Sequence, residues 1–223
     1  MERIVPLSIL CVLVSGANLE PMSPSQVRCV SGRAALVGHL ERAMTDMDMG
    51  ERLREYRESV AVLRLHAPEA TAAVSGLLLD EPGSIRKWQA TYMVGEFGDQ
   101  SALALLRRFV NLPLPQSLAA RGDEHETDLV YDYEVASRFQ ALMSARRIAG
   151  NHTELREEVT AQLVAIAHEV PLLKGAAMSE LRRLLGPDFQ MLRAYFGAED
   201  AYRFERFMPP PEWQARLRQR AQR

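Results

Sequence analysis

Few residues in this chain have the types and spacing needed to bind a metal ion. Asp46-Met47-Asp48-Met49-Gly50 begins like a calcium-binding loop, in which alternate side chains supply oxygen ligands. The glycine comes one place early, however, and Arg57 occupies the twelfth position, where such a loop needs glutamate. We therefore reject a calcium site.

The histidines and the possible nucleophiles also lack the partners that chemistry requires. His168 and Glu169 end a predicted helix without the second histidine of a zinc-binding pair, and His39, His66 and His152 have no cysteine or histidine at ligand spacing. There is no G-x-S-x-G motif, no glycine-rich phosphate loop and no Cys–His pair with local support. We expect no metal, no cofactor and no catalytic residue, unless residues distant in sequence assemble an active site.

The stretch Glu81–Asn111 predicts two short helices joined by a tight corner. Ser84 is a candidate N-cap, and apolar residues follow it at the spacing of one helix face. They are Ile85, Trp88, Ala90, Met93, Val94 and Phe97, whereas Arg86, Lys87, Gln89 and Glu96 fall largely outside this face. We expect Gly98 to end the helix in the left-handed conformation, and Asp99 or Ser101 to cap the next helix.

Similar units end near Gly150 and Gly186. The intervals from Gly98 to Gly150 and from Gly150 to Gly186 are 52 and 36 residues, and a polar, proline-containing insertion at Leu112–Asp128 explains the longer one. Such helix pairs cannot bury their apolar faces alone, and repeats of about this length are typical of α-solenoids.

Ser84–Val110 resembles a HEAT-type repeat, close to the short bacterial form found in phycobilin lyase relatives. The resemblance is carried by Ile85-Arg86, Ala90, Val94-Gly95, Gly98-Asp99 and Ala102-Leu103. The later copies depart from it, with Gln140-Ala141-Leu142 where a small residue is usual and Pro187 inserted before Asp188. The resemblance implies an all-α fold, a short right-handed α-solenoid of antiparallel helix pairs with about three repeats, and the role of a scaffold or binding surface.

The N-terminus has the layout of a secretory signal peptide. Glu2-Arg3 precedes an apolar run, Ile4–Val14, and Ser15-Gly16-Ala17 supplies small residues for cleavage. The run is too short for a retained membrane anchor, so we expect export to the periplasm or outside the cell after cleavage near Ala17. A cytoplasmic chain with an uncleaved apolar first helix is the alternative. After cleavage Cys29 is the only cysteine, either buried on a helix or paired between chains.

Composition and helix-breaking residues predict an almost wholly helical chain. With 47% apolar and 25% charged residues, its 223 residues can bury one sizeable core. The expected organisation is a signal peptide at 1–17, a linker and N-terminal helical cap at 18–68, the repeats at 69–197 with an insertion at 112–128, and a C-terminal helix and basic tail at 198–223. The expected helices are Ser25–Thr45, Glu51–Leu65, Pro68–Leu79, Ser84–Phe97, Ser101–Val110, Asp128–Ala149, Thr153–Glu169, Leu172–Leu185 and Asp188–Phe196.

Two polar segments are candidate binding elements. The acidic insertion can bind a cation or a basic peptide, or it can be a solvated loop in which Thr127 or Asp128 caps the next helix. The arginine-rich tail after Pro211 either docks on a membrane or nucleic acid or stays in solvent. We expect Trp88 to lie in the core. The candidate partner-binding residues are Tyr92, Arg107, Arg108, Asp123, Glu124, Glu126 and Trp213.

The leading functional hypothesis is a non-catalytic exported HEAT-like scaffold that binds a protein or peptide, with a partner helix laid in its groove. The alternative, if the chain is cytoplasmic, is a HEAT-like enzyme related to bilin lyases or to glycosylases of alkylated DNA bases. We expect no nucleic-acid partner, because the net charge is −2 and the helix Thr153–Glu169 carries four glutamates against Arg156 alone. A third hypothesis is a cell-envelope element held to a membrane by its N-terminus or basic tail.

Overall fold

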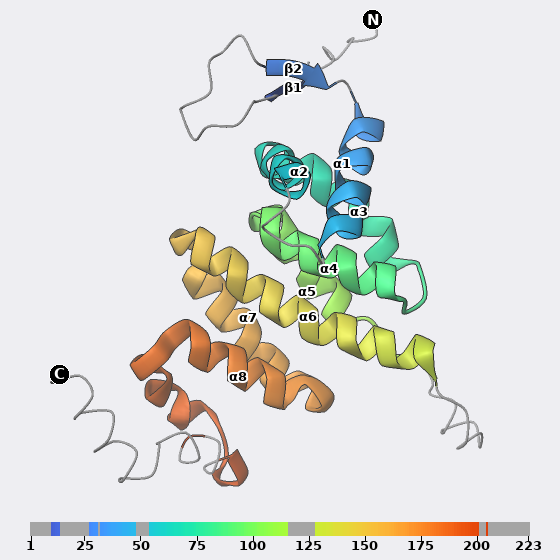
Figure 1. Cartoon of the computed structure of the whole chain (residues 1–223). Coiled ribbons are helices and arrows are strands. Elements are labelled where there is room, and N and C mark those ends of the chain that lie inside the picture. Colours follow the sequence, from blue (N-terminus) through green and yellow to red (C-terminus); the bar gives the residue numbers. More distant parts are fainter. Residues whose placement is uncertain are drawn as a thin grey trace, which may run out of the picture.

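Helices dominate the computed structural model, which describes residues 10–13, 27–30, 32–47, 54–115, 128–200 and 204. The α-helices are α1 (Arg33–Asp46), α2 (Arg54–Leu65), α3 (Ala67–Leu79), α4 (Ile85–Phe97), α5 (Gln100–Val110), α6 (Leu129–Asn151), α7 (Arg156–Glu169) and α8 (Lys174–Leu185) (Figure 1). Short 3-10 helices are η4 (Thr153–Leu155), η5 (Pro171–Leu173), η6 (Gly186–Tyr195) and η7 (Ala198–Asp200). The prediction of a helical protein is confirmed.

The predicted helix Ser25–Thr45 begins too early. Residues 27–30 form a short strand, β2 (Val27–Val30), which pairs antiparallel with β1 (Leu10–Leu13), and the helix starts only at Arg33. Valine and other branched residues favour the extended backbone, which explains why the helix pattern does not extend to this segment. Cys29 therefore lies in a strand, and the register places it opposite Cys11. The expectation that Cys29 lies on a helix is wrong.

The predicted helix caps are largely confirmed. The Ser84 side chain accepts a hydrogen bond from the Lys87 amide, and Asp99 accepts bonds from the amides of Ser101 and Ala102. The Asp128 side chain caps α6 in the same way. Each cap satisfies amides that the first helical turn leaves unpaired.

Gly98 differs from the prediction, because its φ is −68° and not left-handed. The glycine is needed there for another reason. A Cβ atom at this position would lie 2.4 Å from the Val94 carbonyl oxygen and 2.8 Å from Cδ1 of Ile148. The corner between α4 and α5 is therefore pressed against α6, with no room for a side chain.

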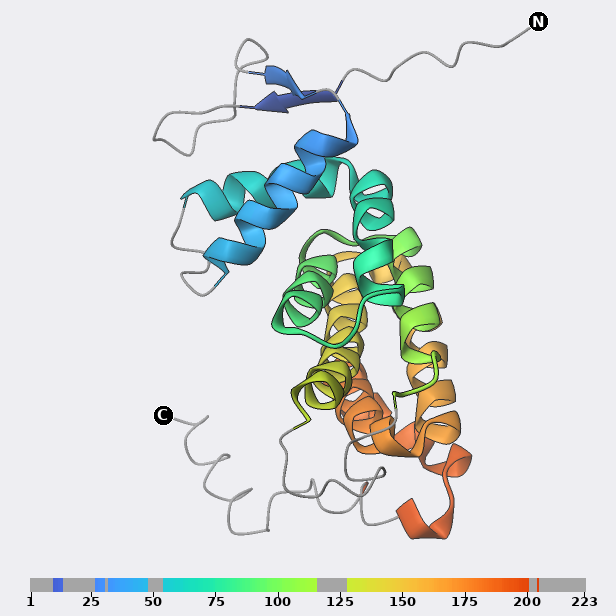
Figure 2. The ribbon, with the colours of Figure 1, turned by 90° about the vertical axis from the view of Figure 1, so that its right-hand side faces the viewer.

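The helices after α2 form two layers. Helices α4, α6 and α8 follow one another on the near side in Figure 1, and the quarter turn in Figure 2 shows α5 and α7 behind them. Helix α3 packs on α5, and α1 and α2 cover the N-terminal end by packing on each other and on α4. Apolar side chains between the layers form one continuous core.

The closest helix contact is between α4 and α6. A Cβ atom on Gly95 would lie 2.8 Å from Cα of Ser144, so only glycine allows the two backbones to approach this closely. The Ser144 hydroxyl donates a 2.8 Å hydrogen bond to the Thr91 carbonyl oxygen. Helix α6 is thus held firmly along α4.

Two residues of the predicted α4 pattern have the opposite burial. Ile85 was expected in the core but is 50% exposed, whereas Lys87, expected on the polar side, is 2% exposed. The N-terminus of α6 covers Lys87, and this contact between distant segments has no signal in the local pattern. The segment expected to form a helix at Asp188–Phe196 is the 3-10 helix η6.

The C-terminal end of the core is closed by aromatic rings. Phe189 and Phe204 stack with ring centroids 4.8 Å apart, and Phe196 lies against both Phe204 and the His168 ring. An ion pair between Lys174 and the buried Asp200 ties η7 to α8.

Candidate binding groove

A groove of about 500 Å³ lies between α5 and α7. It exists because these two helices make little direct contact with each other, although each packs on α6. Buried Leu103 and Ile166 line it, together with the smaller side chains of Ala104, Ala161 and Ala165, of which Ala104 and Ala161 are exposed. Small side chains on both helices leave room for an elongated ligand.

Charged residues of both signs line the groove. Arg107 and Arg108 come from α5, whereas Glu158 and Glu169 come from α7. All four residues are exposed. Within the part of the chain that the structure describes, none of them forms an ion pair, so their charges are available to a ligand.

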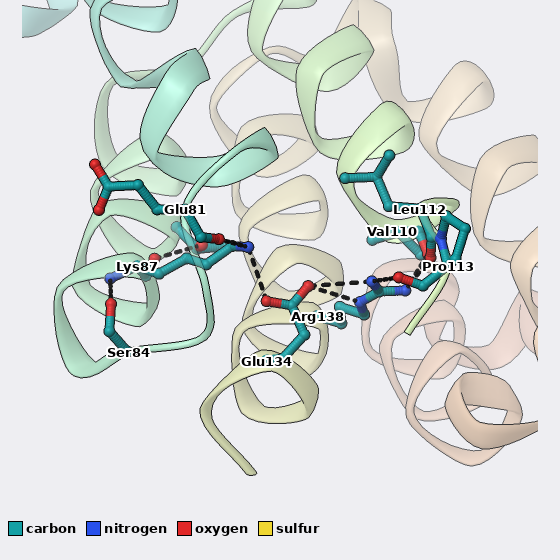
Figure 3. A network of polar contacts seen from close by, with 9 residues as sticks. Glu81, Ser84, Lys87, Val110, Leu112, Pro113, Glu134 and Arg138 are labelled. Atoms are coloured by element: carbon teal, nitrogen blue, oxygen red, sulfur yellow. Dashed lines mark hydrogen bonds and ion pairs between the residues drawn. The ribbon is translucent and has the colours of Figure 1, made fainter. Parts of the chain in front are cut away.

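A buried ion network holds the end of α5 that lines this groove (Figure 3). The Glu134 carboxylate on α6 accepts from the Lys87 ammonium at 2.7 Å and from the Arg138 guanidinium at 3.1 Å. Arg138 also donates to the carbonyl oxygens of Val110, Leu112 and Pro113, the residues through which the chain leaves α5. The network therefore fixes α5 against α6.

The network carries one positive charge more than its single carboxylate neutralises. Arg138 uses every N–H of its guanidinium, in bonds to Glu134 and to the three carbonyl oxygens. The Lys87 ammonium donates to the Glu81 carbonyl oxygen at 2.9 Å and lies 4.8 Å from the Phe109 ring centroid. Carbonyl dipoles and an aromatic face thus stabilise the excess charge. Since the members are satisfied and covered, we assign them a structural role.

The predicted partner-binding residues do not form one site. Arg107 and Arg108 lie in the groove, whereas Tyr92 lies on α4, where it packs on Trp88 and under the Arg147 guanidinium. Trp88 is half-buried at this surface and not in the core as expected. The other predicted residues, Asp123, Glu124, Glu126 and Trp213, lie outside the described residues.

Sequence reasoning missed Glu158 and Glu169 as groove residues and missed the whole buried network. Glu134 and Arg138 are four apart in a helix, a spacing that allows an ion pair but is far more common on solvated surfaces. No local signal distinguishes the buried pair from an exposed one.

The described residues contain no group of three or more histidine, cysteine or acidic side chains that could hold a metal ion. None of the helices described here is both long and apolar enough to cross a membrane. Comparison with protein-family models, curated proteins and solved structures found no match to this chain.

Proposed function

We propose that this chain is a non-catalytic, exported scaffold with the architecture of a short HEAT-like α-solenoid, and that it binds a helical segment of a protein partner in the groove between α5 and α7. The observation that carries this proposal is the groove itself, which combines small lining side chains with charges of both signs that form no ion pair with another described residue.

The shape of the groove favours a helix as the ligand. The alanines that line it would let a second backbone approach closely, and a partner helix would insert apolar side chains spaced by three and four residues. Leu103 and Ile166 supply the apolar surface that these side chains would cover. An amphipathic helix satisfies its own backbone hydrogen bonds, which suits a groove without an unpaired strand edge.

The charges define the chemistry of the partner. Arg107 and Arg108 on α5 suit a helix edge that carries aspartate or glutamate, whereas Glu158 and Glu169 on α7 suit an opposite edge that carries lysine or arginine. Such contacts at the rim of an interface contribute more to orientation than to affinity.

Two further observations support the architecture and the export. The layered order of α3 to α8 fits stacked helix pairs, in which each unit packs on its neighbours. The apolar run and small residues at the N-terminus support secretion.

The test is site-specific photocrosslinking in the native host. A photoreactive phenylalanine analogue replaces Ala161 in the groove or, as a control, the exposed Ala72 on α3. We expect adducts at Ala161 only, mapping to one segment that reads as an amphipathic helix with charges of both signs. A synthetic peptide of that segment should bind the purified chain and lose about tenfold or more affinity with Arg107→Glu. The proposal would be refuted by equal amounts of adduct at both positions, or by a peptide that binds the Arg107→Glu variant as tightly as the unsubstituted chain.

A further inference from the structure

A second surface with an unusual charge pattern lies on the other layer, where α6 runs between α4 and α8. Glu96 on α4 is bracketed by two arginines from different helices. Arg64 on α2 donates to its carboxylate at 3.4 Å and to its carbonyl oxygen at 2.7 Å, and Arg147 on α6 pairs with the other carboxylate oxygen. One carboxylate thus faces two guanidinium groups.

The same arrangement recurs between α6 and α8. Glu180 on α8 accepts from Nε of Arg146 on α6 at 2.6 Å and pairs with Arg183 one turn further along α8. The carboxylate side chain is 4% exposed, whereas the Arg183 side chain is 56% exposed. Consecutive residues of α6, Arg146 and Arg147, therefore link two Arg–Glu–Arg triads across the layer.

Two side chains with apolar surface lie near Arg147. Met143 is 37% exposed and lies one turn before Arg146 and Arg147 on α6. Tyr92 on α4 is half-buried, with its ring centroid 4.5 Å from the guanidinium carbon of Arg147. Exposed aromatic, methionine and arginine side chains are enriched at protein interfaces.

The surface has an excess of positive charge. A hollow of about 350 Å³ adjoins the first triad and is lined by Tyr56, Arg57, Arg64 and Glu96. Arg57 forms no ion pair with any described residue. The two triads and Arg57 together contain five guanidinium groups and two carboxylates, an excess of three positive charges.

The arginines also have hydrogen-bond donors to spare. Arg146 bonds Glu180 through Nε, and its two terminal nitrogens have no partner among the described residues. Arg147 and Arg183 each use a single terminal nitrogen. A guanidinium presents five N–H donors in a planar fork, so carboxylates of a ligand can bind without displacing Glu96 or Glu180.

We propose that this surface, the arginine face (Arg57, Arg64, Arg146, Arg147 and Arg183), binds an acidic polypeptide segment that also carries apolar side chains. The alternation of arginine with glutamate disfavours nucleic acid, whose closely spaced phosphates need an uninterrupted basic track. Exposed Met143 and half-buried Tyr92 provide apolar surface that such a peptide can cover. The inference is independent of the proposed groove, which lies between helices of the other layer.

The test measures binding of two labelled peptides to the full chain by fluorescence anisotropy. In one peptide, pairs of glutamates alternate with single phenylalanines; in the other, glutamine replaces glutamate. We expect the acidic peptide to bind about tenfold or more tightly than its neutral match, and added salt to weaken its binding. The double variant Arg64→Gln, Arg183→Gln should lose about tenfold in affinity. The matched double variant Arg33→Gln, Arg86→Gln removes the same charge from exposed positions outside both proposed sites and should bind unchanged.

A single substitution keeps the test independent of folding. Arg57→Gln breaks no ion pair among the described residues and should still weaken the acidic peptide about threefold or more. Equal losses in the two double variants would show unspecific attraction and overturn the proposal. The proposal is also overturned if the neutral peptide binds as tightly as the acidic peptide. The same holds if an oligonucleotide or phosphatidylglycerol vesicles bind more tightly than the acidic peptide.

Discussion

The substitution Glu134→Gln tests whether the buried network is held by charge or only by shape. Glutamine has the size of glutamate, but its amide has one accepting oxygen and one donating NH2 group, so the substitution removes the negative charge and one of the two acceptors. Lys87 and Arg138 would then lie buried side by side, at 2% relative exposure each, without a counter-ion. Removing one partner of a buried ion pair typically costs about 3–5 kcal/mol.

The substitution Lys87→Met provides the matched comparison. It removes the positive charge in excess and leaves the Glu134–Arg138 pair, with its 3.1 Å bond, intact. What it leaves unsatisfied is the Glu81 carbonyl oxygen and one oxygen of Glu134, a loss of about 1–3 kcal/mol. We therefore expect Glu134→Gln to lower the free energy of unfolding by about 2 kcal/mol more than Lys87→Met.

Urea unfolding followed by circular dichroism measures both values. Glu58→Gln is the control, because Glu58 pairs with Arg54 at the surface, where the two side chains are 41% and 51% exposed. This control should change the free energy of unfolding by less than about 1 kcal/mol. If Lys87→Met lowers the free energy of unfolding as much as Glu134→Gln does, the uncompensated positive charge is not the cause of the loss, and the prediction is wrong.

Three more predictions concern other parts of the chain. Burial, reinforced by Arg42 and partly offset by Glu58, lowers the pKa of His39 below its ordinary 6.5. The free energy of unfolding should therefore fall as the pH drops through this value, and urea titrations at two pH values should show a smaller fall for His39→Asn. Gly95→Ala would place a Cβ 2.8 Å from Cα of Ser144, so it should destabilise by about 1–3 kcal/mol, whereas Gly150→Ala, which meets nothing within 4 Å, should not. Finally, if the chain is exported and its signal peptide is cleaved, protein from its native host should have the mass of a chain that begins near Asn18 and lacks β1; a mass that includes Met1 would contradict cleavage.

Local chemistry explains which parts of the fold could be predicted. Ser84, Asp99 and Asp128 cap helices through bonds to amides two or three residues away, so their roles are visible in the sequence. The roles of Gly98 and Lys87 depend on α6, which approaches from a distant segment. The sequence therefore indicated a glycine corner correctly but assigned the wrong cause, and it placed a core lysine in solvent.

The candidate site was predicted less well for the same reason. Arg107 and Arg108 stand out as an adjacent basic pair at the end of a helix, and they do line the groove. Whether they face Glu158 or Glu169 depends on the gap between α5 and α7, which no pattern within either helix encodes. Tyr92 is predicted together with them, yet it lies in the other layer. Helix periodicity predicts which residues share one face of a helix, but not which other helices lie beside that face.

Three glutamates of this chain show how burial and the number of nearby cations together separate structural from binding surfaces. Glu134 is buried between two cations and has no role left except to hold helices together. Glu96 has the same number of partners but stands at the surface, where its arginines keep unused donors. Glu158 forms no ion pair with another described residue, which is why we propose that it selects a cation on a ligand. The groove therefore suits a partner with both charges, whereas the arginine face suits an acidic one. Since the two surfaces lie on different layers, occupation of one would leave the other open, so a single chain would hold two partners at once if both proposals are correct.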